Sequence, residues 1–304
     1  MTPLLTKRRV LAAKVEDTPG EAETLTASEG AFNAFEVTIN PNIEFVQREG
    51  QSALSPLPGV VAGHGGTISF SIELASDANL ADLLLACGMK KPASSYVPDS
   101  ACATWLTIGV FEDGVYKKLR GAQGTPALVA ETGKPARVNF TFTGIWCVPE
   151  DAELIAPNYP SYTPPRFAGS SVLLDSYAPK ISRLTIDMGN TVILREDPAD
   201  GGQADGSGYC TAAITGRRIT GSMDPEAQLV GTEDSYGDWI DGTTRVLAIV
   251  LGESGGDQVT IEAPCLQFTN LQEADRNGLQ VDTLEFQLVR SADAGDDELS
   301  ITFA

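Results

Sequence analysis

Residues 35–49 read FEVTINPNIEFVQRE, and residues 182–196 read SRLTIDMGNTVILRE. When the two stretches are aligned without a gap, both carry a Thr-Ile pair in mid-strand and end on Arg-Glu. The sequence after each stretch keeps one order: a Gly-rich loop, an alternating strand, a helix start at an aspartate, a hairpin and a final long strand. A shared order of this length is typical of an internal repeat. We therefore expect a duplicated β unit, which favours assembly over catalysis.

Apolar and polar residues alternate in the strands expected within each unit. Every second residue is apolar in residues 67–74, TISFSIEL, and in residues 137–143, RVNFTFT. Residues 218–224 and 283–288 repeat this alternation in the second half. A period of two indicates strands with one face on a core and the other toward water, as in antiparallel sheets.

One short helix is expected in each half. In the first half Ser76 or Asp77 can cap the apolar run ANLADLLLAC, and Gly88 can end the helix. In the second half Asp224, followed by Pro and Glu, is a strong helix start signal. We expect each helix to cover the apolar face of its sheet.

A hairpin is expected after each helix, and the second one contains the only motif that suggests catalysis. The first turns at the Asp-Gly pair 113–114, and the second turns at GESGG, residues 252–256. GESGG also matches the nucleophile-elbow pattern with Ser254 as nucleophile, and His64 lies in a Gly-rich stretch. An elbow needs a helix after the serine, whereas a strand pattern follows here, and a hydrolase of that fold needs its histidine after the serine. We therefore interpret GESGG as a hairpin turn and expect no enzyme.

The fold class expected is mainly β, with two tandem antiparallel β-sandwich or barrel-forming domains and one short flanking helix in each. A segment with five prolines and little periodicity separates the two repeats and favours an extended, semi-rigid path. The predicted organisation is an N-terminal arm at 1–30, a β domain at 31–148, a Pro-rich linker at 149–171 and a second β domain at 172–304.

Composition limits the classes of partner. The chain has 304 residues and a net charge of −20, from 41 acidic and 21 basic residues. Proteins that grip nucleic acid need clustered Lys and Arg, so this balance argues against a phosphate-binding protein. No apolar run approaches the twenty residues of a membrane span, and the N-terminus does not have the pattern of a signal peptide.

The sequence does not predict a metal or another cofactor. Five cysteines without a C-x-x-C pair and a single histidine leave little for a zinc site, so we expect reduced, mostly buried thiols. Residues 197–208, DPADGGQADGSG, have the composition of a calcium loop but not its register. A mobile polar loop is the preferred interpretation, and whether a cation binds it stays open.

Several stretches together resemble the tail tube protein of long-tailed bacteriophages. A short basic N-terminal segment runs into KVEDTPGEAETLT, and a long strand ends in QRE before a flexible loop. GGTISFSIEL, a helix ending in LLLACGM, and PARVNFTFTGIW followed by PED come next, and RRITGSMDPEAQ in the second half is similar in character. These stretches cover most of both repeats.

The resemblance implies a structural subunit of a phage tail, assembled in the host cytoplasm into the virion. Six tube domains form a ring whose sheets join into a wide barrel, and rings stack into a tube. The partners implied are other copies of the chain, the tape-measure protein and the tail terminator and initiator proteins. DNA passes through the lumen without being bound, and no membrane is involved. With two domains per chain we expect a trimeric, pseudo-hexameric ring, and the open variant is a hexamer with the second domain outside.

Site residues follow from the polar faces and from the matched Arg-Glu pairs. If the polar faces line an acidic lumen, phosphates are repelled along its length and DNA slides. The candidate lumen residues are Glu36, Glu44, Ser69, Ser71, Glu73, Asp187, Thr220 and Ser222. The candidate contacts between rings are Arg48, Glu49, Arg195 and Glu196. The alternatives are a solvent-facing sandwich with weak surface ion pairs, and a baseplate, tail-hub or capsid-decoration protein with tandem β domains.

Overall fold

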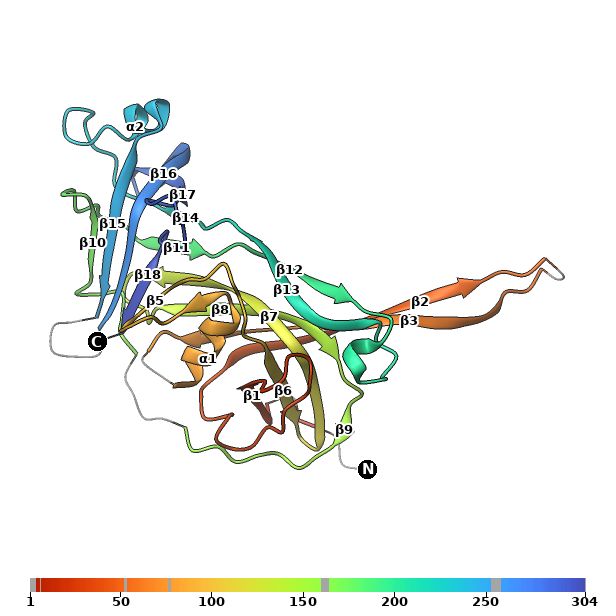
Figure 1. Ribbon diagram of the computed structural model, residues 1–304. Coiled ribbons are helices and arrows are strands. Elements are labelled where there is room, and N and C mark those ends of the chain that lie inside the picture. The colour runs from red at the N-terminus through yellow and green to blue at the C-terminus, as the bar shows by residue number, and fades with distance from the viewer. Residues whose placement is uncertain are drawn as a thin grey trace.

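The computed structural model describes residues 4–5, 7–51, 54–75, 78–159, 164–252 and 258–303. The regular structure of the described chain is mainly antiparallel strands, with two short α-helices (Figure 1). The elements of the first half are β1 Arg9–Val15, β2 Phe35–Arg48, β3 Leu57–Glu73, α1 Ala78–Ala86, β4 Met89–Lys90, β5 Ser95–Pro98, β6 Leu106–Glu112, β7 Val115–Glu131, β8 Arg137–Trp146 and β9 Glu150–Asp151. Those of the second half are β10 Ser171–Leu174, β11 Arg183–Asp187, β12 Asn190–Glu196, the 3₁₀ turn η1 Asp200–Gly202, β13 Tyr209–Arg217, β14 Thr220–Met223, α2 Ser235–Asp241, β15 Thr244–Leu251, β16 Val259–Arg276, β17 Leu279–Leu288 and β18 Ser300–Phe303.

One continuous sheet connects the two halves. Its strand order runs β2-β3-β8-β7-β11-β14-β17-β16 and then β18-β5-β4. Four strands of the first half are thus followed by five of the second, and the short first-half strands β5 and β4 end the order. The halves join where β11 pairs with β7, with Asp187 opposite Ala127 and Arg183 opposite Glu131. All of the pairings are antiparallel, and the prediction of a mainly β, antiparallel fold is confirmed.

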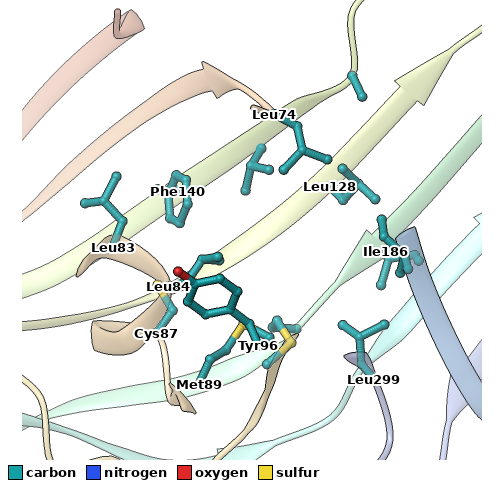
Figure 2. Packing of buried hydrophobic residues seen from close by; sticks show 14 of the residues in the cluster. Leu74, Leu83, Leu84, Cys87, Met89, Tyr96, Leu128, Phe140, Ile186 and Leu299 are labelled. Carbon is teal, nitrogen blue, oxygen red and sulfur yellow. The ribbon is translucent and has the colours of Figure 1, made fainter. Parts of the chain in front are cut away.

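The alternation of the strands places the larger of two hydrophobic clusters under this sheet. In β8, Val138, Phe140 and Phe142 are buried, whereas the residues between them face outward. The rings of Phe70, Phe140 and Phe142 stack with centroids 5.5 to 6.0 Å apart. Figure 2 shows this core continuing past the β7–β11 joint, from Leu128 to Ile186. Because buried residues of both halves form one cluster, the core supports the halves together.

Helix α1 begins and ends where the sequence indicates. Leu80, Leu83 and Leu84 are buried against the sheet, at the spacing that gives a helix one apolar face. Gly88 follows the helix with a φ of 74°, a left-handed conformation that glycine adopts without strain. The expected caps Ser76 and Asp77 lie outside the described residues. In the described part of the chain, neither helix has the length and apolarity needed to cross a membrane.

The predicted helix at Asp224 is wrong. The Asp224 carboxylate instead accepts hydrogen bonds from the backbone of Ser182 and Arg183, each 2.8 Å long, and pairs with Arg276. The Pro225 carbonyl accepts the N–H of Asp282 on β17, so the chain continues along the sheet. A carboxylate that can cap a helix is held here by tertiary partners.

The second helix, α2, starts at residue 235 and does not cover an apolar face. Its N-cap is Asp234, whose side chain accepts the Gly237 N–H at 2.8 Å, and Gly242 ends it with a φ of 65°. Ser235 is its only buried residue, and Ile240 is 80% exposed.

The segments expected to be an arm and a linker are held against the body. Within residues 1–30, strand β1 pairs with β6, and its residues 10–13 are buried. Within 149–171, β9 pairs with the start of β7, Pro135 and Arg166 form a bridge, and Phe167 is buried. Residues 160–163 lie outside the described part. The described parts of both segments are therefore parts of the fold.

Candidate functional site

The most prominent surface feature is the hairpin of β2 and β3, which extends far from the body (Figure 1). From Pro41 to Val61 almost every described residue is exposed on both faces of this ribbon. Many of these residues are large and apolar: Ile43, Phe45, Val46, Leu54, Leu57, Val60 and Val61 are each at least 44% exposed. Such a cluster on a projecting element indicates a surface that contacts another molecule.

The hairpin is built around a ring packed on a glycine. Phe45 lies directly opposite Val61, and its ring occupies the place where a Cβ of Gly59 would stand, 2.1 Å from the nearest ring atom. The β-branched residues of both strands favour the extended conformation. β3 starts at Leu57, so much of the Gly-rich loop expected after residues 35–49 is strand.

The predicted ring-contact residues Arg48 and Glu49 lie near the tip of this hairpin, and both are exposed. Glu44 also lies on the projecting part, away from the other predicted lumen residues. The sequence contained a signal for this hairpin in the apolar residues Ile43, Phe45 and Val46. Phe45 and Val46 point to opposite faces of the strand, whereas a strand with one buried face has its apolar residues on that face only.

The corresponding hairpin of the second half, β12 and β13, is folded onto the first half. Asn190 donates its side-chain N–H groups to the carbonyls of Cys87 and Gly124, at 2.7 and 2.9 Å. Gln123 accepts the Ile214 N–H at 2.9 Å through its side-chain oxygen. Buried polar groups are costly when unpaired, so these bonds fix the position of the hairpin. Arg195 and Glu196 are exposed at the end of β12.

The carboxylates of residues 197–208 are used within the protein. Asp197 and Asp200 accept backbone N–H groups of the loop itself, including a bond of 2.6 Å from Gly208 to Asp200. Asp205 forms an ion pair of 2.7 Å with Arg120 of β7, whose side chain is 3% exposed. Burial raises the pKa of Asp205, but the hydrogen bonds from Arg120 and Ser207 outweigh it and lower that pKa. In the described part of the chain, no cluster of His, Cys, Asp or Glu could hold a metal ion.

Arg120 also connects this loop to the N-terminal segment. Its guanidinium donates to the Gly20 carbonyl at 2.8 Å. Beside it, Glu16 accepts the N–H groups of Gly20 and Gly121 and the hydroxyl of Thr107, at 2.6 to 2.9 Å. Burial raises the pKa of Glu16, and these hydrogen bonds offset part of the rise. The cluster therefore positions three chain segments and leaves no group free for chemistry.

Six of the predicted lumen residues share the polar face of the continuous sheet. Residues directly opposite one another on paired strands point to the same side. Ser71, Asn139, Ala127, Asp187 and Thr220 follow one another across β3, β8, β7, β11 and β14. Glu73 and Ser222 lie on the same side of the sheet, in the adjacent row of paired residues. Ser69 lies in the row on the other side of Ser71, and its hydroxyl is 3.1 Å from that of Thr141.

Of the remaining two predicted lumen residues, Glu36 lines a hollow with Ser71 and Asn139 of the polar face, and Glu44 lies away from it. Glu36 is exposed at a bulge of β2 with a φ of 55°, and Glu44 is on the hairpin. Of the six predicted lumen residues on the polar face, Ser71 is only 3% exposed, so its neighbours cover it. The polar face thus crosses the β7–β11 joint without interruption and consists mainly of hydroxyl, amide and acidic side chains.

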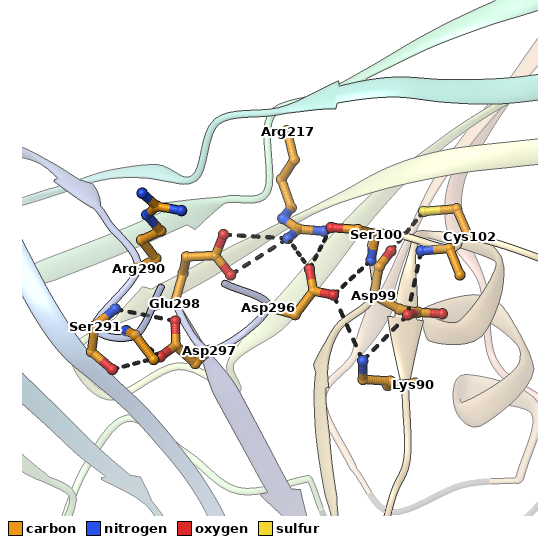
Figure 3. A network of polar contacts seen from close by, with 12 residues as sticks. Lys90, Asp99, Ser100, Cys102, Arg217, Arg290, Ser291, Asp296, Asp297 and Glu298 are labelled. Carbon is orange, nitrogen blue, oxygen red and sulfur yellow. Dashed lines mark hydrogen bonds and ion pairs between the residues drawn. The ribbon is translucent and has the colours of Figure 1, made fainter. Parts of the chain in front are cut away.

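A charged cluster attaches the C-terminal segment to both halves (Figure 3). Arg217 of β13 binds Asp296 at 2.9 Å and Glu298 at 3.3 Å. Asp296 also accepts the backbone N–H and the hydroxyl of Ser100, at 3.0 and 2.6 Å, and lies 3.7 Å from Lys90. Burial raises the pKa of Asp296, but the bonds from Ser100 and Arg217 outweigh it and lower that pKa to about 2. Strand β18, which follows, pairs with β16 and β5 and so spans the two halves.

The described chain after the rejected hydrolase motif is a strand. Ser254 lies outside the described residues, and the chain enters strand β16 at Val259, where an elbow would need a helix. His64 lies in β3 opposite Ile43, and its backbone N–H binds the Ser207 carbonyl. Of the five cysteines, none of which forms a disulfide, only Cys87 is buried; the others are partly exposed.

These features define a class: a β-sheet structural protein whose polar groups hold its own fold and whose apolar hairpin is exposed for contact. Comparison with known families gives the particular one. The chain matches the model of the phage tail tube protein over residues 6–295 and belongs to this family of structural, non-enzymatic virion tail components. A search of curated proteins found none that matches. The resemblance inferred from the sequence is confirmed.

Proposed function

We propose that the chain is the subunit of a tail tube made of stacked rings, and that the β2–β3 hairpin makes the contact between rings. Its two halves act as two tube-like units, so that three chains complete a ring of six units. DNA and the tape-measure protein pass through the lumen, and terminator and initiator proteins bound the tube at its ends.

The observation that carries the proposal is the exposed apolar hairpin. Monomeric proteins rarely leave so many large apolar side chains together on a projecting ribbon, because burying them is favourable at about 25 cal/mol per Å². A hairpin that reaches far beyond its own body can contact only a different chain. Repetition of such a head-to-tail contact produces an open stack.

The polar face of the continuous sheet is the proposed lining of the lumen. Besides hydroxyl and amide groups it carries Glu73, Asp187 and Glu285. Its arginines are Arg137, which lies over the Phe35 ring 4.6 Å from its centroid, Arg183, which is opposite Glu131, and Arg218, which donates to Gln287 at 3.4 Å. A mildly acidic, hydroxyl-rich face with few free cations offers phosphates no attachment points.

The test is negative-stain electron microscopy and mass photometry of the purified protein over a range of concentrations. Tubes whose rings contain three chains support the proposal. Rings of six chains keep the tube but place one half of each chain away from the lumen. Closed oligomers that never stack contradict a tube subunit and favour a hub or decoration protein.

A shortened hairpin separates ring formation from stacking. Replacing residues 47–59 by Asn-Gly closes a two-residue turn at the Val46–Val60 pair and removes the tip. We expect rings that do not stack. Removal of residues 198–208 is not an equivalent test, because Asp205 and the buried Ser207 hold that loop to the body. Normal tubes from the shortened chain would refute the role of the hairpin.

A further inference from the structure

Several edges of the continuous sheet lack a second partner strand in the described chain, and two of them, on β2 and β16, border its polar face. Strand β2 is the first in the sheet order and pairs only with β3. Residues 269–275 of β16 pair only with β17, because β15 leaves β16 at Gln267. Among the described residues, no backbone hydrogen bond reaches the outer side of either edge; one β2 carbonyl, that of Val37, accepts the Arg9 guanidinium. Unpaired edges are sites where another strand adds.

The joint inside the chain shows how such edges fit together. Strand β11 lies along residues 127–131 of β7 in antiparallel register, with Asp187 opposite Ala127 and Ile186 opposite Leu128. Leu128 and Ile186 point to the core, and Asp187 points to the polar face. At this joint, apolar side chains of both strands therefore face the core, and the polar face continues from one strand to the next.

The free edge of β16 corresponds to the part of β7 that makes this joint. In the first half Val138 of β8 faces Leu128, and in the second half Leu284 of β17 faces Leu271. Both pairs are largely buried and occupy the same place in the alternation of their strands. Residues 270–274 of β16 therefore stand where residues 127–131 of β7 stand.

The free edge of β2 corresponds to β11 in the same way. Asp187 lies opposite Thr220, and Thr38 lies opposite Ser69; Thr220 and Ser69 occupy matching places on their strands. The ladder thus matches Thr38 to Asp187, two residues away from the ungapped sequence alignment. The bulge at Glu36 accounts for part of this offset.

We propose, resting on the proposed function, that β2 of one chain pairs with β16 of a second copy and that this joint closes the ring. The register is antiparallel, with Thr38 opposite Asn270, Val37 opposite Leu271 and Phe35 opposite Gln272. Val37 is half-buried beside the core, and Leu271 is buried, so this register joins core side to core side. Thr38 and Asn270 then continue the polar face from one chain into the next.

The occupant is a second copy because each chain carries one edge of each kind. The two edges differ, so the contact is head-to-tail and cannot pair two chains symmetrically. Closing the ring removes both exposed edges, which a long, partly apolar edge such as β2 needs for solubility. The joint between chains then repeats the joint within the chain.

Disulfide trapping tests the register. Directly opposite residues in an antiparallel pair have Cβ atoms about 4.5–5.5 Å apart, within reach of a disulfide, whereas a shift of two residues on the same face moves them to about 7–8 Å. The test variant is Thr38→Cys with Asn270→Cys, and the matched control is Thr38→Cys with Gln272→Cys. Each single variant measures the background from the five native thiols.

We expect the in-register pair to give covalent multimers on a non-reducing gel, at least about tenfold more than the shifted pair, and only when rings form. Amides of residues 35–38 and 270–274 should also gain hydrogen-exchange protection on assembly. Tubes without in-register cross-linking, or equal cross-linking of both pairs, would overturn the joint while leaving the tube function intact. Absence of rings and tubes at every concentration would overturn both.

Discussion

Replacing Phe45 by serine should prevent stacking without harming the fold. Phe45 is 60% exposed in the chain and lies on the projecting hairpin. A phenylalanine offers roughly 200 Å² for burial, so about 120 Å² is still available to a partner. At about 25 cal/mol per Å² its burial between rings contributes about 3 kcal/mol. Losing it should raise the critical concentration for tube growth roughly 100-fold.

Sedimentation of tubes over a concentration series measures this change, and urea unfolding of the unassembled chain supplies the comparison. We expect the unfolding free energy of Phe45→Ser to fall by less than about 1 kcal/mol, as for other exposed side chains. Phe45→Leu is the matched control. Its critical concentration for tube growth should lie between those of the parent chain and Phe45→Ser, because leucine keeps an apolar side chain. An unchanged critical concentration for the serine variant would refute the reasoning, and so would a large loss of unfolding stability.

Three further predictions concern single residues. Gly59→Ala places a methyl group where the Phe45 ring lies, so tube growth should weaken in the same direction while the far-ultraviolet spectrum is unchanged; growth equal to that of the parent chain would show that the ring position does not matter. Asp296 has a pKa of about 2 in the folded chain, below its ordinary value, so its stabilisation is complete above about pH 4 and is lost as the pH falls through 2. In Asp296→Asn, urea unfolding at pH 4 and pH 2 should therefore differ less than in the parent chain, and an equal difference would contradict the assignment. Asp234→Ala removes the cap of α2 and should cost about 1 kcal/mol locally, seen as faster amide exchange in residues 235–241 with the core unchanged; unaltered exchange there would argue against the cap.

The strands and the first hairpin could be predicted because their signals are local. Alternation in residues 67–74 and 137–143 specifies which side chains face the core, whatever else the chain does. The Asp-Gly pair at 113–114 turns β6 into β7, and Gly114 has the positive φ that such a turn needs. Helix α1 carries its own apolar face and its own terminating glycine, and it also forms as predicted.

The second helix was misplaced because its signal depends on tertiary partners. Asp224, Pro and Glu make a good helix start, but Arg276 and the Ser182 backbone compete for the same carboxylate. The local sequence does not contain Arg276, which is brought in by the β16–β17 hairpin. Asp234 and Gly242 bracket the true helix, and this weaker signal was present in the sequence.

The surfaces were the hardest part to predict, since exposure depends on what the rest of the chain covers. The pairs Arg48-Glu49 and Arg195-Glu196 look equivalent in sequence, yet one lies on a free hairpin and the other beside a hairpin held in place by its own chain. Pattern alone cannot distinguish them, because both strands are extended and both pairs are polar.

The two hairpins differ because only the second one has a covering surface in the described part of its own chain. The second half has the first half beside it, so β12 and β13 find a covering partner in the same molecule, and Asn190 and Ile214 make the bonds that fix them there. In the described chain β2 and β3 have no such covering partner, and their projecting part remains exposed. The surface that receives β2 and β3 therefore belongs to another chain, which in the proposed tube lies in the neighbouring ring. A subunit that covers one of its hairpins and leaves the other exposed needs other copies of itself to complete its structure, and assembly supplies them.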